Sequence, residues 1–472
     1  MFMIVFDIIN DEAPLFIEAV KALSTYDTAK ENFLFITEGN RWKEETNDLD
    51  CSNRLLFFDD LDKKNINIEK ELERISIEYD SFNIYASDRY LIKKDRDFQR
   101  KFLVYTYLYF ESIFSKNVTH YFTTGVAYTY NLISFQVSKK YSVKHISFYG
   151  IRLENRTAIS FDNKNTFNEV LELYKDFKVE NVTLKMYDPI NKFLNKPKQP
   201  DYMGNAINSS KLEPVFIKEF FIRFRKFYLS NKHHYDFFTR NPFELSLFKI
   251  KKILNAKKVE ILHNSIFDKV NKKDKYFIFP LHMQPEASTL ILSPFYVNQK
   301  ECIINISKLL PVDKYLYVKE HKSALGQHSL KFYNELKKHP NIKLISYRES
   351  MFNLIKNSIG TINLSSTVGL ESLMIKKPSI LLGNVFYNDS GLTFRVNSFL
   401  QLGEVLNQVS KSSFNLDNVS ENYDERLAYY LYALNKKSYP FAFNVAKMDT
   451  KKKVMTKENI KEFSKCIETI LS

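Results

Sequence analysis

Residues 360–371 read GTINLSSTVGLE, and they decide the fold class because a strand-like apolar run changes into a helical pattern within them. The apolar run Gly360–Leu364 predicts a buried strand, and the pattern of Thr367–Ile375 predicts a helix. Hydroxyl side chains fill the junction, Ser365–Thr367. A strand that passes through a short turn into a helix is the unit from which parallel, doubly wound sheets are built.

The same alternation extends along the second half of the chain. Apolar runs predict further strands over Tyr276–Leu281, Tyr315–Val318, Lys343–Ser346 and Ser379–Leu382. Helical periodicity covers Tyr296–Leu310 and Ser350–Asn357. We therefore assign residues 271–440 to one α/β, Rossmann-like domain with a parallel sheet.

A second alternation occupies the first third of the chain. It predicts strands over Phe2–Ile9, Asn32–Thr37, Leu55–Phe58, Val118–Thr123 and His145–Phe148. Predicted helices cover Pro14–Leu23, Ile66–Ile77, Asp95–Phe114 and Ala127–Ser138. We assign residues 1–200 to an N-terminal Rossmann-like domain, 201–270 to a helical connection and 441–472 to a helical tail. Its last helix, Lys457–Leu471, is expected to return to the first domain. Two domains also suit 472 residues, since single cores stop growing at roughly 250–300.

The composition is that of a globular protein with a basic surface. Hydrophobic residues make up 44% and charged residues 26%, and the formal net charge is +14. This charge favours an anionic substrate or an anionic membrane surface, although a solvated lysine-rich face explains it equally well. The lysines are scattered, and no arginine-rich arm or zinc-ligand spacing accompanies them, so we expect no nucleic-acid binding.

Several features indicate a cytoplasmic protein. The three cysteines, Cys51, Cys302 and Cys466, match neither a metal-ligand spacing nor a disulfide framework. The apolar start Met1–Ile9 lacks the basic flank of a signal peptide. No run reaches about 18 uninterrupted apolar residues. Any contact with the inner face of the cytoplasmic membrane is therefore expected to be peripheral.

Polar side chains follow the predicted strands of the second domain, and parallel sheets bind ligands beyond the carboxyl ends of their strands. The loop after Tyr276–Leu281 carries His282, Gln284 and Glu286. Glu286 is a candidate catalytic acid or base, and His282 and Gln284 are candidates for donor binding. The alternative is that Glu286 and Ser288 only cap the next helix.

The strand Tyr315–Val318 ends in Lys319-Glu320-His321-Lys322. Lysines at a strand end neutralise a phosphate, and a histidine donates a hydrogen bond to a leaving phosphate oxygen. His321 is thus a candidate catalytic residue and Lys319 a candidate donor contact. An exposed turn of the same residues would merely be solvated.

Two more segments complete the candidate donor site. Asn363 and Ser365, Ser366 and Thr367 stand before a helix N-terminus, which attracts anions. Glu371 is expected one turn into that helix, where it would accept hydrogen bonds from ribose hydroxyls. The alternative is simple capping with a surface glutamate. Gly383 follows the next strand and would allow a ligand to approach the backbone, or is a plain turn glycine.

These four segments, in this order, resemble the capsule polysaccharide synthesis family, which includes bacterial capsule Kdo transferases. Kdo is an eight-carbon acidic sugar. The similar features are Gln284-Pro285-Glu286, Lys319-Glu320-His321, the Ser-Thr-Val-Gly-x-Glu helix start at 366–371, and the Gly-x-x-Phe-Tyr…Gly-Leu-Thr stretch at 383–393. The similarity covers about residues 276–403.

The resemblance implies a GT-B fold, in which two Rossmann-like domains with parallel sheets face each other across a cleft. It implies a metal-independent glycosyltransferase without a cofactor. The sugar would pass from a nucleotide sugar in the C-terminal domain to an oligosaccharide or lipid-linked acceptor, extending capsule or lipopolysaccharide. His321 and the Ser365–Thr367 turn would bind the donor phosphate, and Glu286 would lie near the reacting carbon.

Related sialyl and Kdo transferases have a His-Pro pair where this chain has His321-Lys322, so the donor, CMP-Kdo or another nucleotide sugar, stays open. In the first domain, Arg152 and Arg156 are candidate contacts for an anionic acceptor, with surface ion pairs as the alternative. Two other functions would use the same kind of domain: a nucleotide-sugar epimerase or hydrolase, and a non-catalytic component of capsule assembly or export.

Overall fold

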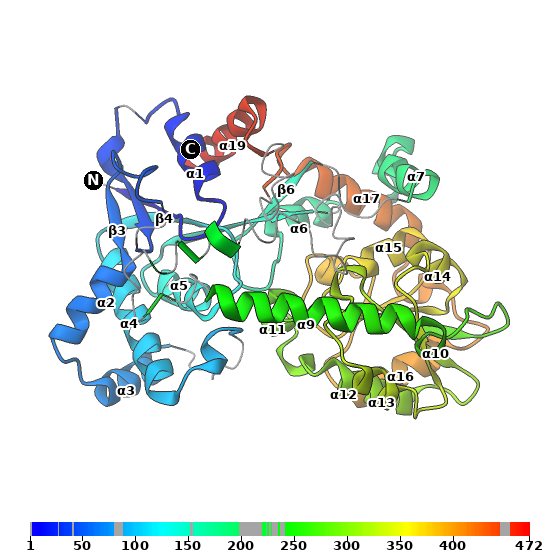
Figure 1. The fold of residues 1–472 in the computed structure, drawn as a ribbon. Helices are drawn as coiled ribbons and strands as arrows, with labels where there is room; N and C mark the ends of the chain where they lie inside the picture. Colours follow the sequence, from blue (N-terminus) through cyan, green and yellow to red (C-terminus); the bar gives the residue numbers. More distant parts are fainter. Residues whose placement is uncertain are drawn as a thin grey trace. The chain divides into compact units, whose positions relative to one another are not determined.

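The computed structural model describes residues 2–26, 28–39, 42–79, 88–151, 153, 155–197, 220–222, 224–225, 228, 235–236, 241–443 and 454–472. The chain divides into two compact units. Unit 1 comprises residues 1–168, 224–240 and 435–472, and unit 2 comprises residues 169–223 and 241–434. The first and last helices, coloured blue and red in Figure 1, both belong to unit 1.

Unit 1 is built on a six-stranded sheet. Its strands are β1 (Met3–Asp7), β2 (Phe33–Thr37), β3 (Cys51–Asn53), β4 (Val118–Thr123), β5 (Lys144–Gly150) and β6 (Thr157–Ser160), in the order β3-β2-β1-β4-β5-β6. All neighbours are parallel except β5 and β6. Every residue of β2 is buried, as expected for a strand covered on both faces.

Helices cover both faces of this sheet. One face packs against α2 (Arg54–Lys63), α3 (Ile68–Glu78), α4 (Arg96–Phe114) and α5 (Thr129–Lys140). The other packs against α1 (Ala13–Lys21) and α19 (Lys457–Leu471). Successive residues of a strand point to opposite faces, so Val5 joins the first core and Phe6 the second. Unit 1 is therefore doubly wound.

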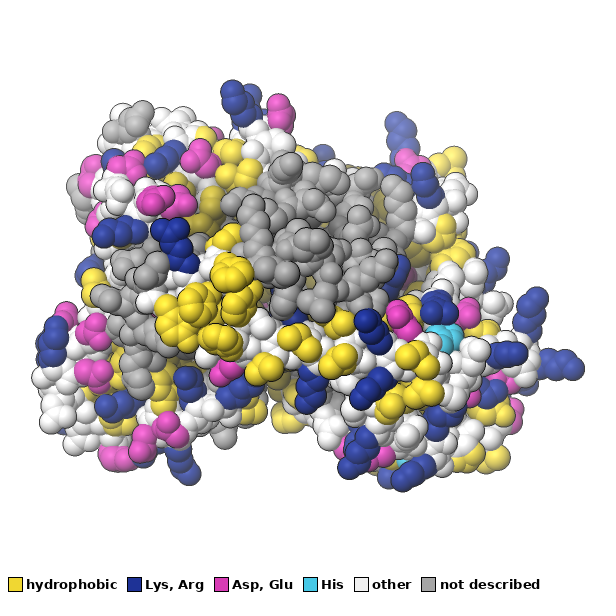
Figure 2. All heavy atoms as spheres, viewed as in Figure 1, with side chains coloured by type: hydrophobic (Ala, Val, Ile, Leu, Met, Phe, Trp, Pro, Cys, Tyr) yellow, Lys and Arg dark blue, Asp and Glu magenta, His cyan; other side chains and the backbone are white. Residues whose placement is uncertain are grey.

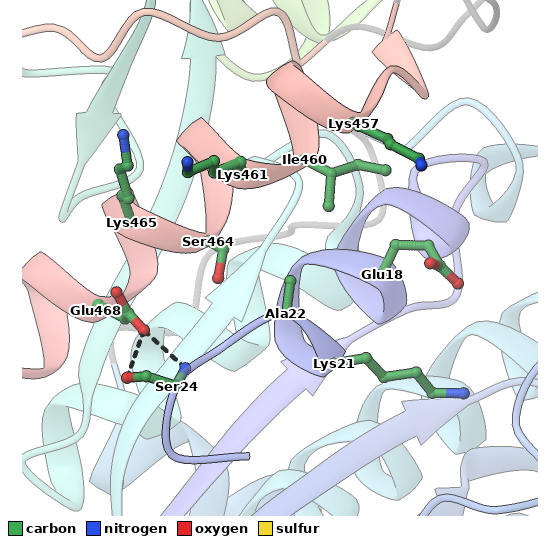
Figure 3. Close-up of a pocket in the computed structure, with 10 residues that line it drawn as sticks. All are labelled: Glu18, Lys21, Ala22, Ser24, Lys457, Ile460, Lys461, Ser464, Lys465 and Glu468. Atoms are coloured by element: carbon green, nitrogen blue, oxygen red, sulfur yellow. Dashed lines mark hydrogen bonds between the residues drawn. The ribbon is translucent and has the colours of Figure 1, made fainter. Parts of the chain in front are cut away.

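The helix α19 packs against α1, although the two helices lie at opposite ends of the sequence. Phe463 and Ile467 enter the same core as Phe16. The backbone N–H and the hydroxyl of Ser24 both donate to Glu468 at 2.8 Å (Figure 3). The tail thus returns to the first unit, as the sequence predicts, and the helix has the predicted bounds.

Unit 2 has a wholly parallel six-stranded sheet. Its strands are β7 (Tyr276–Pro280), β8 (Tyr315–Lys319), β9 (Ile342–Ile345), β10 (Gly360–Asn363), β11 (Ser379–Leu381) and β12 (Phe394–Arg395), in the order β12-β11-β10-β7-β8-β9. Read from the other edge, this is the order 3-2-1-4-5-6, which unit 1 repeats with its own strands. The predicted fold class is confirmed: the protein is α/β with two Rossmann-like units.

The remaining helices belong mainly to unit 2. They are α6 (Asn168–Lys175), α7 (Asp188–Asn195), α9 (Pro242–Ile261), α10 (His263–Ile266), α11 (Ala287–Leu290), α12 (Gln299–Leu309), α13 (Leu330–Leu336), α14 (Met351–Asn357), α15 (Val368–Met374), α16 (Phe399–Val409) and α17 (Tyr423–Lys436). Short 3-10 helices are Lys30–Asn32, Leu91–Lys93, Val179–Asn181, Leu184–Tyr187, Pro294–Tyr296, Lys322–Ala324, Asn388–Ser390 and Leu416–Asn418. No helix in the described ranges combines the length and the hydropathy needed to cross a bilayer.

The strand predicted over Leu55–Phe58 is wrong, because this run is the first turn of α2. The side chain of Asn53 accepts a hydrogen bond from the Leu55 N–H and so caps the helix. The true strand, β3, is the preceding Cys51–Asn53, which is only partly buried. Four apolar residues fit a strand and one helical face equally well, and the capping asparagine decides between them here.

The division of the chain also differs from the predicted boundaries. Residues 169–197, predicted within the N-terminal domain, cluster with unit 2, and so does α9, predicted as part of a connection. Residues 441–472 join unit 1. The strands β6 and β12 were not predicted, since each is no longer than four residues.

Candidate functional site

The loops after β7 and β10 meet where the strand order of unit 2 reverses. β7 and β10 are neighbours, but the chain continues from β7 to β8 on one side and from β10 to β11 on the other. Ligands of open parallel sheets bind in the crevice that such a reversal creates. The Ser365 hydroxyl donates to the Ser288 carbonyl at 2.6 Å, so the loops that carry Glu286 and Ser365 are directly joined.

A side chain of α12 and a backbone carbonyl of the turn before that helix hold the loop after β7. The His282 N–H donates to Gln299 Oε1 at 2.8 Å, and Gln299 Nε2 donates back to the His282 carbonyl at 3.0 Å. Gln284 Nε2 donates to the Val297 carbonyl at 2.6 Å. One role of Gln284 is therefore to shape the loop. Gln299, which the sequence did not single out, fixes the position of His282.

Glu286 is half-buried and precedes α11. Its backbone carbonyl accepts the N–H groups of Thr289 and Leu290, at 3.2 and 2.9 Å. Its carboxylate forms no side-chain cap on α11 and accepts a hydrogen bond from Ser288 Oγ at 3.4 Å. Glu286 thus stands at the N-cap position through its backbone, and the capping alternative does not account for its carboxylate.

At the end of β8, His321 is held in one tautomer. Its Nδ1 accepts a hydrogen bond from the backbone N–H of Ser323 at 3.2 Å. Burial lowers the pKa of His321, the charge of Glu320 opposes this shift, and Lys319 and Lys252 reinforce it. The ring is therefore neutral at pH 7 and carries its proton on Nε2. A neutral Nε2–H is a hydrogen-bond donor.

Glu320 anchors the turn that presents His321. Its side chain is 1% exposed and accepts hydrogen bonds from the His321 N–H at 2.8 Å, from His328 Nδ1 at 3.2 Å and from the Tyr333 hydroxyl at 2.5 Å. Burial alone would raise the pKa of Glu320, but these hydrogen bonds hold it below its usual value. The solvated-turn alternative is therefore wrong for this residue.

Lys319 is also buried, with 8% exposed. Burial lowers its pKa to about 8, against the opposing charges of Glu320 and Glu349. At pH 7 the ammonium group is still mostly protonated. A cation that is partly stripped of water at a strand end gains more from an incoming anion than an exposed lysine does.

His282 completes a pair of neutral histidines. Burial, together with the smaller effect of the nearby His321, lowers the pKa of His282 to about 4. Its Nε2 is buried and has no hydrogen-bond partner among the described residues. The structure thus places His282, Lys319 and His321 at the adjacent ends of β7 and β8.

This pair predicts a pH dependence of stability. The pKa of His282 is lower in the folded state, about 4, than its ordinary value of 6.5. Between these two pH values, His282 therefore binds a proton in the unfolded chain but not in the folded protein. Folding stability is then fully present above pH 6.5 and falls by about 3 kcal/mol as the pH drops towards 4. Denaturant unfolding between pH 7 and 4 should show a smaller loss for His282→Gln than for the wild type. His339→Gln, at the amino end of β9, should keep the wild-type profile; an unchanged profile in His282→Gln would contradict the assignment.

The predicted residues around β10 separate into two groups. Ser366 Oγ accepts the Val368 N–H at 3.1 Å, beside Thr367, the N-cap residue of α15. Asn363 is fully buried instead and donates to Thr361 Oγ1 at 2.9 Å and Ser379 Oγ at 3.3 Å. Glu371 is 8% exposed, so the alternative of a surface glutamate is wrong.

Gly369 and Gly383, in the two motifs at residues 366–371 and 383–393, have no room for a side chain because other protein atoms lie too close. A Cβ on Gly383 would lie 1.9 Å from Ser293 Oγ and 2.7 Å from the Leu364 carbonyl oxygen. Gly383 is therefore required by close packing against other protein segments, and the approach of a ligand to its backbone stays a prediction. A Cβ on Gly369 would lie 2.1 Å from the hydroxyl of Tyr387, which donates to the Ser366 carbonyl. The Ser-Thr-Val-Gly and Phe-Tyr motifs thus pack on each other.

Gly369→Ala should destabilise unit 2, because α15 and Tyr387 would have to move apart. We expect a loss of about 1–3 kcal/mol in the free energy of unfolding, measured by denaturant titration. Adding Tyr387→Phe removes the nearest atom and should recover part of the loss. If Gly369→Ala alone unfolds at the wild-type denaturant concentration, this packing is not tight.

The candidate acceptor residues lie in unit 1. Arg152 falls outside the described residues. Arg156 donates from Nε to Ser438 Oγ at 2.7 Å and from Nη2 to the carbonyls of Asn435, at 2.5 Å, and Ser438. These partners are a hydroxyl and two carbonyls, so they differ from the carboxylate of a surface ion pair. They connect the start of β6 to the chain segment that leads towards α19.

Comparison with known proteins finds a family model that matches part of the chain. Residues 190–400 match the model described as capsule polysaccharide biosynthesis protein. The match covers less than half of the chain. It contains every predicted site residue of unit 2, from His282 to Gly383. The search of curated proteins gave no match.

The solved structures that this chain matches have low sequence identity to it. The Kdo 2,7 transferase of Thermosulfurimonas dismutans KpsC is 11% identical, with a TM-score of 0.33, over 90% of this chain and 89% of that one. Its Kdo 2,4 transferase is 13% identical, with a TM-score of 0.29, over 66% and 79%. The UDP-GlcNAc 2-epimerase of Neisseria meningitidis is 12% identical, with a TM-score of 0.26, over 92% and 98%.

Proposed function

We propose that this protein is a glycosyltransferase that builds a capsule or related surface polysaccharide from a nucleotide-sugar donor. The observation that carries the proposal is His321, held neutral with its proton on Nε2 at the end of β8, beside the buried ammonium group of Lys319. A departing phosphate accepts hydrogen bonds and carries negative charge, so a hydrogen-bond donor and a positively charged group both stabilise it. The family of residues 190–400 supports the same reaction class.

In the proposed reaction, the bond between the anomeric carbon and the donor phosphate oxygen breaks while an acceptor hydroxyl oxygen bonds to that carbon. Glu286 accepts the hydroxyl proton or stabilises the positive charge that develops on the sugar. The released phosphate keeps the electron pair, and His321 Nε2–H and Lys319 stabilise it. Ser365, Ser366 and Thr367 are proposed to contact the same phosphate, and the Ser366 hydroxyl is positioned by the Val368 N–H.

The other candidate residues are assigned to the donor or the acceptor by their positions in the two units. His282, Gln284, Asn363, Glu371 and Gly383 support the donor loops, and Glu371 is proposed to bind the ribose. Unit 1 is proposed to bind the oligosaccharide or lipid-linked acceptor, with Arg152 and Arg156 as contacts for its anionic groups. None of these steps uses a metal ion or cofactor, and we propose that the protein works in the cytoplasm.

The test is a donor screen with purified protein. CMP-linked and UDP-linked sugars are incubated with and without a lipid-linked oligosaccharide extract, and products are identified by mass spectrometry. We expect transfer only when the acceptor is present, and the same rate with EDTA. Conversion of the donor without acceptor would show an epimerase or hydrolase instead. No calorimetric binding of CMP or UDP would show a non-catalytic protein.

A further inference from the structure

The long helix α9 exposes an apolar stripe to solvent. Phe243, Leu247, Ile250, Leu254 and Ile261 are 48%, 67%, 40%, 54% and 82% exposed. Their spacing of three, four or seven residues places them along one face of the helix. Figure 2 shows hydrophobic side chains running along α9 with lysines among them. A row of large exposed apolar side chains costs solubility and marks an interaction surface.

Lysines border this stripe. Lys251 and Lys258 each follow a stripe leucine by four residues, and Lys257 lies on the other flank. All three are exposed. Within the part of the chain that the structure describes, none of them pairs with a carboxylate. The helix carries five lysines against two glutamates, Glu244 and Glu260, so its own side chains have a net positive charge.

The opposite face of α9 packs against the candidate site. Ala256 and Val259 enter the core of unit 2. Lys252 Nζ donates to the Ser323 carbonyl at 2.9 Å, and a Cβ on Gly326 would lie 2.1 Å from the Lys252 carbonyl oxygen. The inner face is therefore fixed against the turn that presents His321, and the outer face cannot rotate inward to bury its apolar residues.

We propose that α9 is an interfacial helix that places unit 2 on an anionic lipid membrane. The stripe would enter the boundary between headgroups and acyl chains, while Lys251, Lys257 and Lys258 contact lipid phosphates. A helix of 20 residues is about 30 Å long, which allows the whole stripe to lie in the membrane plane. A protein partner would account for the apolar side chains, but the flanking unpaired lysines favour an anionic lipid surface.

The experiment is co-sedimentation of the full chain with vesicles of phosphatidylcholine alone or mixed with phosphatidylglycerol. We expect binding to the mixed vesicles and at least about 10-fold weaker partitioning for Leu247→Gln/Leu254→Gln. Lys251→Glu/Lys258→Glu should also weaken binding about 10-fold, and more so at low salt than at high salt. Leu400→Gln, a leucine 77% exposed on α16, is the matched control and should bind as the wild type does.

Three results would overturn the proposal. These are no sedimentation with either vesicle, equal binding to neutral and anionic vesicles, or a wild-type dimer that Leu247→Gln/Leu254→Gln converts to a monomer. The last result would make the stripe an interface between copies. Transfer to a water-soluble acceptor is measured in parallel and should not change in either double variant, so a failure of membrane binding is distinguishable from a failure of the proposed function.

Discussion

His321→Ala should lower kcat for glycosyl transfer by about 100- to 1000-fold while the protein stays folded. The reason is that a neutral Nε2–H, fixed by the Ser323 N–H on the other ring nitrogen, is lost as a donor to the departing phosphate. His321→Asn is the sharper variant, because its side-chain oxygen can still accept the Ser323 N–H but cannot extend a donor to the Nε2 position. Both rates are measured at saturating donor.

The matched control is His339→Ala, since His339 precedes β9 at the amino end of the same sheet. It should turn over as the wild type does. If His321→Asn restores the wild-type kcat that His321→Ala loses, the histidine acts by shaping its turn rather than by touching the phosphate. Wild-type turnover in both variants would remove His321 from the mechanism.

Glu286→Gln should reduce kcat by about 100- to 10,000-fold, with a much smaller change in donor affinity. The substitution preserves the shape of the side chain and its contact with Ser288, but an amide cannot accept a proton at neutral pH. Calorimetry with the nucleotide and steady-state transfer rates separate the two effects. Glu301→Gln, at an exposed position of α12, is the control. If Glu286→Gln keeps nearly full activity, Glu286 does not accept the proton of the acceptor hydroxyl and another group must do so.

The sequence was sufficient where a pattern is local and continuous. The strand Val118–Thr123 and the helix Lys457–Leu471 were predicted with the bounds that they have. Unbroken apolar runs and helical periodicity follow from burial on one or both faces, which every residue of the element shares. The same rule fails for Leu55–Phe58, because a run of four apolar residues contains only one helical turn.

The candidate site was predictable in position but not in its internal contacts. A histidine after a strand of a parallel sheet must lie at the ligand-binding edge, so His321 was placed from the pattern alone. The burial of Glu320 was not predictable, since its partners His328 and Tyr333 lie 8 and 13 residues further along the chain. Gly383 shows the same limit: its neighbour Ser293 comes from another loop, and no local signal reveals that contact.

The position of α19 has a consequence for synthesis of the chain. A ribosome releases the residues of unit 2 before Lys457–Leu471, yet those last residues cover one face of the sheet that was made first. Domains usually fold in the order of translation. Phe16 of α1 and Phe148 of β5 therefore lack their contacts with α19 until that helix has been made, and this apolar surface of a newly made chain stays exposed until then.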